Sequence, residues 1–378
     1  MRPLDGVLVL DFTTLLPGPL ATLMLAEAGA TVVKIERPEG EASRGYLPQW
    51  EGVSAPFQLL NRGKRSIGID LKGPAAAEQL RPLIEVADVL VEQFRPGVME
   101  RLGLGYDQVR AVKPDIVYCS ISGYGRFGPR AAEAGHDLNY QAVTGLYVNA
   151  HHPSEPTPPA ALVADIGGGT LPAVINILLA LMRRDRSGEG AHLDIAMADA
   201  CFAFEVYQQA EVVATGAASP PNRGRLTGGS ARYGVHLSKD DKLIAVGALE
   251  DKFWDGLCDV LGLKGADRDD RAVPERSKAA VAAAFRKRTR AEWAPLLAAA
   301  DCCATPVATF EEAIQDAHFV ERGLFDHAVA GEGGTIPAAA VPVAPAFRGD
   351  PAVPVAAPRE MEPADDIAAL AARLKPRR

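Results

Sequence analysis

His136 and Asp165 are the two side chains of this sequence best suited to do chemistry together. Each lies close to glycine, in Gly135-His136-Asp137 and in Asp165-Ile166-Gly167-Gly168-Gly169, and each comes just before a helical pattern. An imidazole and a carboxylate can both accept and donate protons near neutral pH when their surroundings tune them. If the two lay on opposite sides of one carbon atom, one could remove a proton and the other could return one to the opposite face. The pair therefore predicts a racemisation.

Both residues also have ordinary explanations. His136 could be a surface histidine, and Asp165 could be a carboxylate that stabilises the start of a helix through its dipole. Gly167-Gly168-Gly169 exceeds what a helix cap needs, and three glycines would let a bulky ligand approach the backbone closely. Asp137 begins a polar-to-apolar run, so a backbone N–H at this predicted helix start could face a bound oxygen atom.

Three groups of basic residues lie next to predicted strands: Arg37-Pro38, Asn61-Arg62-Gly63-Lys64-Arg65 and Arg95-Pro96-Gly97. For any single group, a solvated charged surface is the better explanation. Together, at the ends of successive strands, they fit a nucleotide-like ligand with several phosphates. Arginine makes bidentate contacts with phosphate, and lysine supplies a point charge.

Two further patterns carry little functional weight. The segment from Gly123 to Gly128 matches G-x-G-x-x-G, but Pro129 follows at once and no helix opens there, so the segment predicts a turn and not a dinucleotide site. His151-His152, Asp194 and Asp199 lack metal-ligand spacing, and we expect no metal site.

Strand patterns alternate with helical patterns over the first 200 residues. Strands are predicted at residues 6–12, 30–36, 66–71, 89–92 and 115–120; Pro17-Gly18-Pro19 is predicted as a turn, and the helix after it ends at Gly29. This alternation predicts an α/β fold with a doubly wound, Rossmann-like parallel sheet. Sites in such sheets lie beyond the carboxyl ends of the strands, often where the strand order reverses.

The composition changes past about residue 200. Residues 216–229 are rich in Gly, Pro, Ser and Asn, and residues 232–237 and 242–247 alternate around a Lys-Asp-Asp turn, which predicts an antiparallel hairpin. We therefore expect a large α/β domain from residues 1–200 and 325–378, a smaller α+β domain from residues 215–320, and a linker helix region at residues 200–215.

The totals describe an ordinary globular protein. The 378 residues are 48% hydrophobic and 23% charged, and the net charge of -8 argues against nucleic-acid binding. The longest apolar run, residues 171–182, is shorter than a membrane span and predicts a buried helix. Five cysteines without framework spacing and no visible export signal lead us to expect reduced thiols, a cytoplasmic location and no membrane partner.

Taken in order, these motifs resemble CoA-transferase family III, and within it the α-methylacyl-CoA racemase branch. The resemblance runs over nearly the whole chain, and Gly-His-Asp is its racemase-specific part. The segments that carry it are Val9-Leu10-Asp11-Phe12, Val33-Lys34-Ile35-Glu36-Arg37-Pro38, Leu60-Asn61-Arg62-Gly63-Lys64-Arg65, Phe94-Arg95-Pro96-Gly97, Gly135-His136-Asp137-Leu138-Asn139-Tyr140, Ala164-Asp165-Ile166-Gly167-Gly168-Gly169 and Val246-Gly247-Ala248-Leu249-Glu250.

The resemblance implies roles for particular residues. His136 and Asp165 would be the acid/base pair, Glu250 would support His136, and the backbone N–H of Asp137 would hold the thioester oxygen. The CoA phosphates and adenine region would be held by Arg37, Arg62, Lys64 and Arg95. CoA would be part of the substrate, so no separate cofactor is implied, and the fold would be an interlocked homodimer. Several racemases have asparagine four residues before the catalytic aspartate, where this chain has Ala161.

Two other functions remain open at this stage. In a family III CoA-transferase, Asp165 would attack the thioester as a nucleophile and form a mixed anhydride, and His136 would have no necessary role. A non-catalytic CoA- or nucleotide-binding protein is the third possibility. The presence of His136, Asp165 and Glu250 together argues against it. The sequence does not identify the acyl group.

Overall fold

The computed structural model describes residues 1–150, 157–363 and 367–374, which fall into two compact units. The first unit comprises Met1–Thr144, Ala160–Phe204 and Ala317–Arg378, and the second comprises Gly145–Pro159 and Glu205–Asp316. The sequence prediction had not assigned residues 145–159 to the second unit, because no change in composition marks that short segment.

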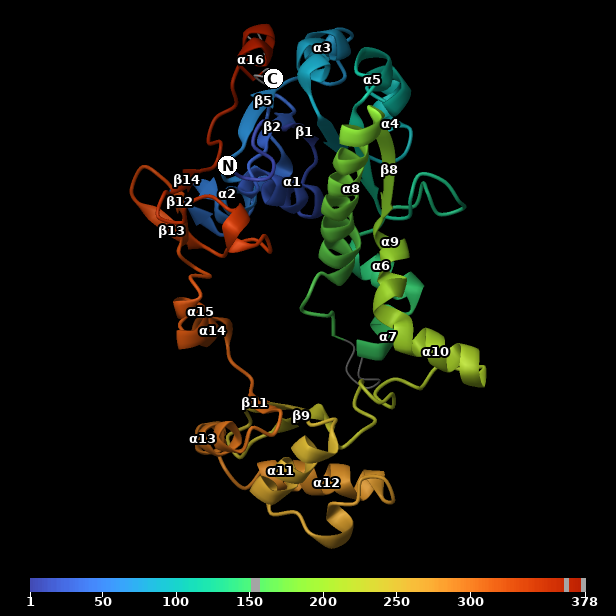
Figure 1. Ribbon diagram of the computed structural model, residues 1–378, viewed down its shortest axis with the longest axis vertical. Coiled ribbons are helices and arrows are strands. Elements are labelled where there is room, and N and C mark those ends of the chain that lie inside the picture. The colour runs from blue at the N-terminus through green and yellow to red at the C-terminus, as the bar shows by residue number, and fades with distance from the viewer. Residues whose placement is uncertain (151–156, 364–366, 375–378) are drawn as a thin grey trace. The chain divides into compact units, whose positions relative to one another are not determined.

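A six-stranded parallel sheet forms the centre of the first unit (Figure 1). Its strands, in spatial order, are β5 (Arg65–Gly68), β2 (Thr31–Glu36), β1 (Leu8–Phe12), β6 (Val89–Glu92), β7 (Val117–Ser122) and β8 (Ala191–Ala196). The chain moves outward from β1 to β5, returns to β6 beside β1, and moves outward again. The order therefore reverses between β1 and β6, and the predicted α/β fold with a parallel sheet is confirmed.

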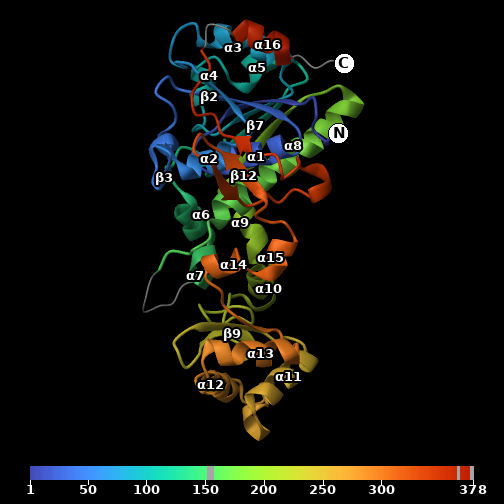
Figure 2. The ribbon, with the colours of Figure 1, turned by 90° about the vertical axis from the view of Figure 1, so that its left-hand side faces the viewer.

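Helices cover both faces of this sheet, as Figure 2 shows. Side chains from alternate positions of β1 pack with α3 (Ala76–Val86), α5 (Tyr106–Val112) and α16 (Ile367–Leu374), while α1 (Pro17–Glu27) and α8 (Leu171–Ser187) lie together on the other face. The predicted turn at Pro17-Gly18-Pro19 is wrong, because these residues form the first turn of α1. Proline suits that position, since its fixed φ is helical and the missing N–H would have no partner there.

Helix α8 is only half buried, in contrast to the prediction of a buried helix. Ala173, Val174, Ile177, Ala180 and Leu181 face the core, whereas an apolar stripe on the other side is exposed, formed by Leu171, Ile175, Leu178, Leu179 and Met182. The α8 helix continues a π-helical segment, Ala164–Thr170, so one helix of 24 residues runs from Ala164 to Ser187. By length and composition alone it could cross a membrane, but 44% of its apolar window is buried, and a core helix passes the same test.

The remaining elements of the first unit are short. They are α2 (Ala55–Asn61), α4 (Val98–Arg101), α6 (Asp137–Thr144), α9 (Met197–Cys201) and α15 (Ala317–Glu321), the 3-10 turns Ala42–Gly45 and Pro345–Phe347, the pair β3 (Gln49–Trp50) and β4 (Val53–Ser54), and a small sheet of β12 (His327–Ala330), β13 (Thr335–Ala338) and β14 (Val355–Ala356).

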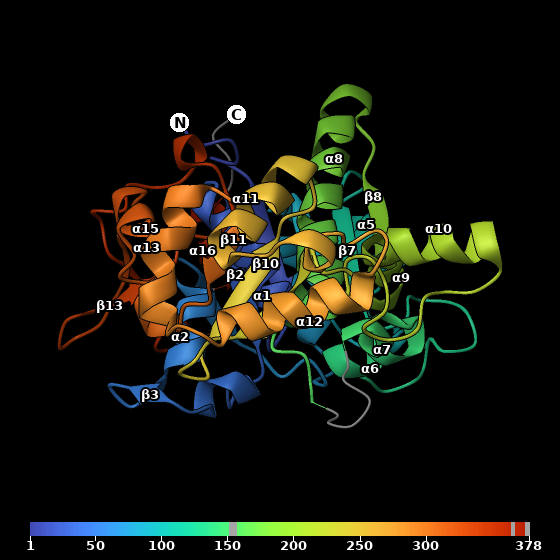
Figure 3. The ribbon, with the colours of Figure 1, turned by 90° about the horizontal axis from the view of Figure 1, so that it is seen from below.

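The second unit has its own three-stranded antiparallel sheet and its own core. The predicted hairpin is confirmed, since β9 (Tyr233–Leu237) pairs with β10 (Leu243–Gly247), and β11 (Ala304–Pro306) adds to the other edge of β10. Trp254, Phe285 and Trp293 are buried where the helices pack on this sheet. These helices, seen in Figure 3, are α11 (Asp251–Leu261), α12 (Pro274–Phe285) and α13 (Arg290–Ala300). The unit also contains α7 (Leu146–Ala150), α10 (Val206–Thr215), α14 (Phe310–Ala313) and the 3-10 turn Gly265–Asp267.

Candidate active site

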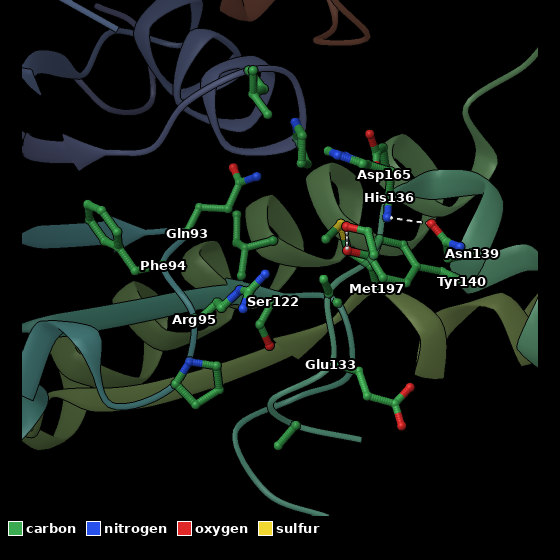
Figure 4. Close-up of a pocket in the computed structure, with 18 of the residues that line it drawn as sticks. Gln93, Phe94, Arg95, Ser122, Glu133, His136, Asn139, Tyr140, Asp165 and Met197 are labelled. Carbon is green, nitrogen blue, oxygen red and sulfur yellow. Dashed lines mark hydrogen bonds between the residues drawn. The ribbon is translucent and has the colours of Figure 1, made fainter. Parts of the chain in front are cut away.

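A cavity of about 410 Å³ opens at the carboxyl ends of β1, β6 and β7, where the strand order reverses. Its volume is in the range of small-molecule sites, and this place in an open α/β sheet is where such sites occur. Figure 4 shows His136, Asp165 and Asn139 gathered on one side of the cavity, and Gln93, Phe94 and Arg95 on the other. The structure therefore brings the two predicted acid/base residues to one cavity.

His136 occupies the position before the first turn of α6. Its backbone N–H donates to the Asn139 side chain at 3.0 Å, and its carbonyl oxygen accepts from the Asn139 N–H at 2.8 Å (Figure 4). The hydroxyl of Tyr140 donates to the Gly135 carbonyl oxygen at 2.6 Å. These contacts fix the main chain around His136, while its exposed ring remains available to a ligand in the cavity.

Asp165 lies in the first turn of the π-helical segment, a type of helix that is rare and often found at functional sites. The Thr170 hydroxyl ties this segment to α1 by donating to the Pro17 carbonyl oxygen at 2.8 Å. Burial and then the nearby Asp137 carboxylate raise the pKa of Asp165 to about 6, and His136 acts in the opposite direction. A carboxyl group with this pKa can hold or release a proton near neutral pH.

Asp137 is buried, and α6 begins at this residue as predicted. Asp137 is not among the residues that line the cavity, and its carboxylate accepts hydrogen bonds from the backbone N–H groups of Ala164 and Asp165, at 2.8 and 3.0 Å. The predicted ligand contact concerns the backbone N–H of Asp137. In the described part of the chain this N–H has no hydrogen-bond acceptor. The first N–H groups of a helix have no partner within it, and an oxyanion is favourable there.

The three glycines after Asp165 serve close packing within the protein. A Cβ atom on Gly168 would lie 2.3 Å from the Met197 carbonyl oxygen, and one on Gly169 would meet Met197 and Pro17 at 3.0–3.2 Å. On Gly167 it would meet the end of the Phe204 ring. These glycines therefore make room for other parts of the protein and not for a ligand, because residues of α9 and α1 and the Phe204 ring already occupy the space beside them.

Arg95 and Arg37 are both exposed at strand ends. Arg95 follows β6 and lines the cavity, whereas Arg37 follows β2, lies outside the cavity lining and donates from Nε to the Gly40 carbonyl oxygen at 2.6 Å. The turn predicted for Gly123 to Gly128 is confirmed, with Gly125 and Gly128 at φ values of 81° and 96°.

Arg62 and Lys64 lie in the interior, in contrast to the other two predicted cations. Arg62 forms an ion pair with Glu27 at 3.0 Å, and Lys64 forms one with Asp11 at 3.2 Å. Lys64 also donates to Pro19 and Asn61 oxygens. A phosphate could reach neither cation without breaking these contacts, so the predicted cations left to bind an anionic ligand are Arg37 and Arg95.

Glu250 and the pair His151-His152 do not belong to the first unit as the structure describes it. Glu250 belongs to the second unit, where it is exposed directly before α11 and its carbonyl oxygen accepts from the N–H groups of Phe253 and Trp254. His151 and His152 are outside the described residues. In the ranges that the structure describes, no group of three or more His, Cys, Asp or Glu side chains is arranged to hold a metal ion.

Sequence reasoning missed Gln93 and Asn139 as parts of the site. Gln93 lines the cavity directly after β6. Its side-chain oxygen accepts from the Gly18 N–H at 3.1 Å and so gives one N–H group of the first turn of α1 a hydrogen-bond partner. Asn139 was visible within the Gly-His-Asp-Leu-Asn motif, three residues after His136, a position from which a side chain can reach back to the backbone N–H at a helix start.

Comparison with known proteins agrees with this geometry. The family model described as CoA-transferase family III matches residues 4–360. The chain belongs to CoA-transferase family III. Within this family, the chain is 34% identical over 356 residues to α-methylacyl-CoA racemase of Homo sapiens, covering 92% of this chain and 90% of that protein. It is also 34% identical over 322 residues to acetyl-CoA:oxalate CoA-transferase of Acetobacter aceti, covering 82% of each.

Solved structures of family III proteins have the same fold. Rv3272 from M. tuberculosis superposes with a TM-score of 0.81 at 28% identity, over 97% of this chain and 98% of that one. A CAIB/BAIF family protein from Brucella suis superposes with a TM-score of 0.79 at 28% identity, over 99% of both chains. The chain is therefore an enzyme of family III, whose relatives at equal identity include both a racemase and a transferase.

Proposed function

We propose that this enzyme interconverts the (2R) and (2S) forms of 2-methylacyl-CoA thioesters. The observation that carries the proposal is the pairing of His136 with Asp165 in one cavity, together with the pKa of about 6 for Asp165. A racemase needs two groups that exchange protons with the same carbon, and both groups must change protonation state near the working pH. A transferase needs the aspartate alone.

The reaction is a proton exchange through an enolate. When Asp165 accepts the α-proton of one enantiomer, protonated His136 donates to the opposite face; for the other enantiomer the roles reverse. Negative charge collects on the thioester oxygen during this step, and the N–H of Asp137, the first residue of α6, would donate to it. One such preorganised donor contributes about 3–4 kcal/mol in comparable sites.

The anionic part of CoA would be held by Arg95 and Arg37. Replacing Arg95 with alanine is expected to raise KM for the thioester several-fold, because the variant loses a guanidinium contact with the anionic ligand. Arg81→Ala is the control, since Arg81 is paired with Glu85 on the surface of α3. Equal KM values for the two variants would contradict a role for Arg95 in CoA binding.

CoA transfer between acids is the second candidate. Its support is the acetyl-CoA:oxalate CoA-transferase relative, whose identity of 34% equals that of the racemase. In this scheme Asp165 attacks the thioester carbonyl carbon, CoA leaves as the thiolate, and the acyl group becomes an anhydride on Asp165. The acceptor carboxylate then attacks the Asp165 carbonyl carbon of this anhydride and releases the first acid. The CoA thiolate attacks the acceptor carbon of the new anhydride, which forms the new thioester and frees the Asp165 carboxylate.

A single incubation separates the two functions. One pure 2-methylacyl-CoA enantiomer is incubated with the enzyme in D₂O without any acceptor acid, and deuterium at the α-carbon is followed by NMR together with optical purity. The racemase proposal expects deuterium incorporation with loss of optical purity. No incorporation, combined with acyl movement once an acceptor acid is added, would replace it with the transferase.

We also propose, from the family resemblance, that the active enzyme is an interlocked homodimer in which Glu250 of the partner subunit supports His136. Co-expressed His136→Ala and Glu250→Gln chains would then form mixed dimers with one intact site. Random assembly predicts recovery to about a quarter of wild-type activity by counting sites in a two-fold dimer. Background activity in isolated mixed dimers, with both single variants inactive, would contradict the shared site.

A further inference from the structure

The Asp137 carboxylate connects the two halves of the cavity wall that carry His136 and Asp165. One of its oxygens accepts from the N–H groups of Ala164 and Asp165, and the other accepts from the Gln141 side chain at 2.6 Å. Asp137 and Gln141 are 4% and 2% exposed, respectively. Asp137 directly follows His136 in sequence, so this one side chain joins the backbone of one acid/base residue to that of the other.

We propose that the Asp137 carboxylate is a positioning residue for Asp165: it clamps the first turn of the π-helical segment and holds a negative charge beside the Asp165 carboxyl group. The inference rests on the proposed function only in taking Asp165 as the reacting carboxyl group. It applies equally to the racemase and the transferase. It concerns the side chain of Asp137, whereas the thioester contact proposed above concerns its backbone.

The clamp depends on the unpaired backbone N–H groups at the start of the π-helical segment. The first N–H groups of a helix have no partner within it, and a buried unpaired N–H is costly. Ala164 is buried and Asp165 is partly buried, so water cannot readily replace the acceptor. A carboxylate that accepts both N–H groups therefore fixes the direction in which the Asp165 side chain leaves the backbone. Charge-assisted bonds of this kind are the strong ones.

The electrostatic part depends on every charged group that faces Asp165. From the α6 side these are Asp137 and His136, of which the first raises and the second lowers its pKa; the neutral phenol of Tyr140 lies beside them. Arg95 lies across the cavity. The starts of α1 and α8 are formed by uncharged residues, α9 carries only the exposed Asp199, and the Asp194 carboxylate of β8 accepts from the Arg126 N–H. Asp137 is thus the nearby anion with a direct effect on Asp165.

Gln141 makes the two parts of the proposal separable. In Asp137→Asn, the amide oxygen can still accept from Ala164 and Asp165, and the amide nitrogen can donate to Gln141 once the Gln141 amide turns over. This variant removes the charge and keeps the clamp. Asp137→Ala removes both, and Gln141→Leu keeps the charge but releases one side of the carboxylate.

The decisive measurement is the titration of the Asp165 carboxyl carbon by ¹³C NMR, assigned by comparison with Asp165→Asn. In Asp137→Asn the pKa of Asp165 is expected to fall below about 6, while burial, the larger cause, keeps it above the usual aspartate value of 3.8. In the direction that uses protonated Asp165, the pH at which half of the rate is lost should fall together with this pKa. A pKa still at about 6 would overturn the electrostatic part.

The clamp is tested by rate. Asp137→Ala is expected to lose about 10²-fold in kcat, since a reacting group misplaced by 1 Å costs that much, and Gln141→Leu is expected to fall between it and the wild type. Wild-type kcat in folded Asp137→Ala, or in Gln141→Leu should the alanine variant not fold, would overturn the clamp. If the wild-type enzyme shows no α-proton exchange but Asp165 titrates as expected, the racemase proposal fails and this inference stands.

Discussion

Replacing His136 with glutamine is expected to slow racemisation of 2-methylacyl-CoA by about 10²–10⁴-fold, the usual contribution of one positioned acid/base group. Glutamine keeps a polar side chain of similar length but cannot exchange a proton. The fold should be unaffected, because the contacts of His136 with α6 are made by its backbone and its ring is exposed. The same variant should retain any transferase activity, which gives the substitution its diagnostic value.

Loss of α-proton exchange in D₂O is the measurement, with thermal unfolding as the check on the fold. Glu133→Gln is a suitable control, since Glu133 lines the same cavity and is exposed but has no part in the proposed chemistry. It should keep most of the activity. A His136→Gln variant that racemises as fast as the control would remove His136 from the mechanism.

Replacing Lys64 with methionine is expected to destabilise the enzyme by about 3–5 kcal/mol, the usual cost of leaving one partner of a buried ion pair alone. The side chains of Lys64 and Asp11 are both 0% exposed. Asp11 also accepts from the Thr13 and Thr22 hydroxyls, and Lys34 donates to the Thr13 carbonyl oxygen at 2.7 Å. Removing the Lys64 charge would therefore disturb the loop after β1 that lines the cavity.

Urea unfolding of the variant would measure this loss, and Arg65→Met is its matched control. Arg65 is the next residue, but its ion pair with Glu362 lies at the surface, where such pairs contribute at most about 1 kcal/mol. Similar losses in the two variants would contradict the structural role of Lys64. Near-normal stability of Lys64→Met, together with weakened CoA binding, would return Lys64 to the ligand-binding role that the sequence suggested.

The fold was largely predictable because buried parallel strands appear as short apolar runs. The runs at β1, β2 and β6 contain few polar residues, and their positions in the structure agree with the prediction. The edge strand β8 was missed because His192 and Asp194 interrupt its apolar pattern. The exposed stripe on α8 was also unpredictable, since an apolar residue looks the same in sequence on either face of a helix.

The residues of the candidate site were predictable where a single short motif identifies them. They were unpredictable where contacts with residues far away in the sequence determine whether a side chain can reach a ligand. His136 and Asp165 were found from their immediate neighbours, and the strand order then brings them to one cavity. The fate of Arg62 and Lys64 depends on Glu27 and Asp11, which lie 35 and 53 residues earlier in the chain. The spacing of basic residues along the sequence does not show which side chains form ion pairs with buried carboxylates and which are free to bind a ligand.

The close packing around the glycines after Asp165 limits which substitutions at these positions would survive directed evolution of the enzyme. In a library randomised at all three positions, Gly168 should be recovered almost without exception, because any side chain there would collide with the Met197 backbone. Gly167 should tolerate small residues, since only the half-exposed Phe204 ring must move aside. Searches for new acyl specificity are therefore better directed at the cavity-lining loops than at this turn.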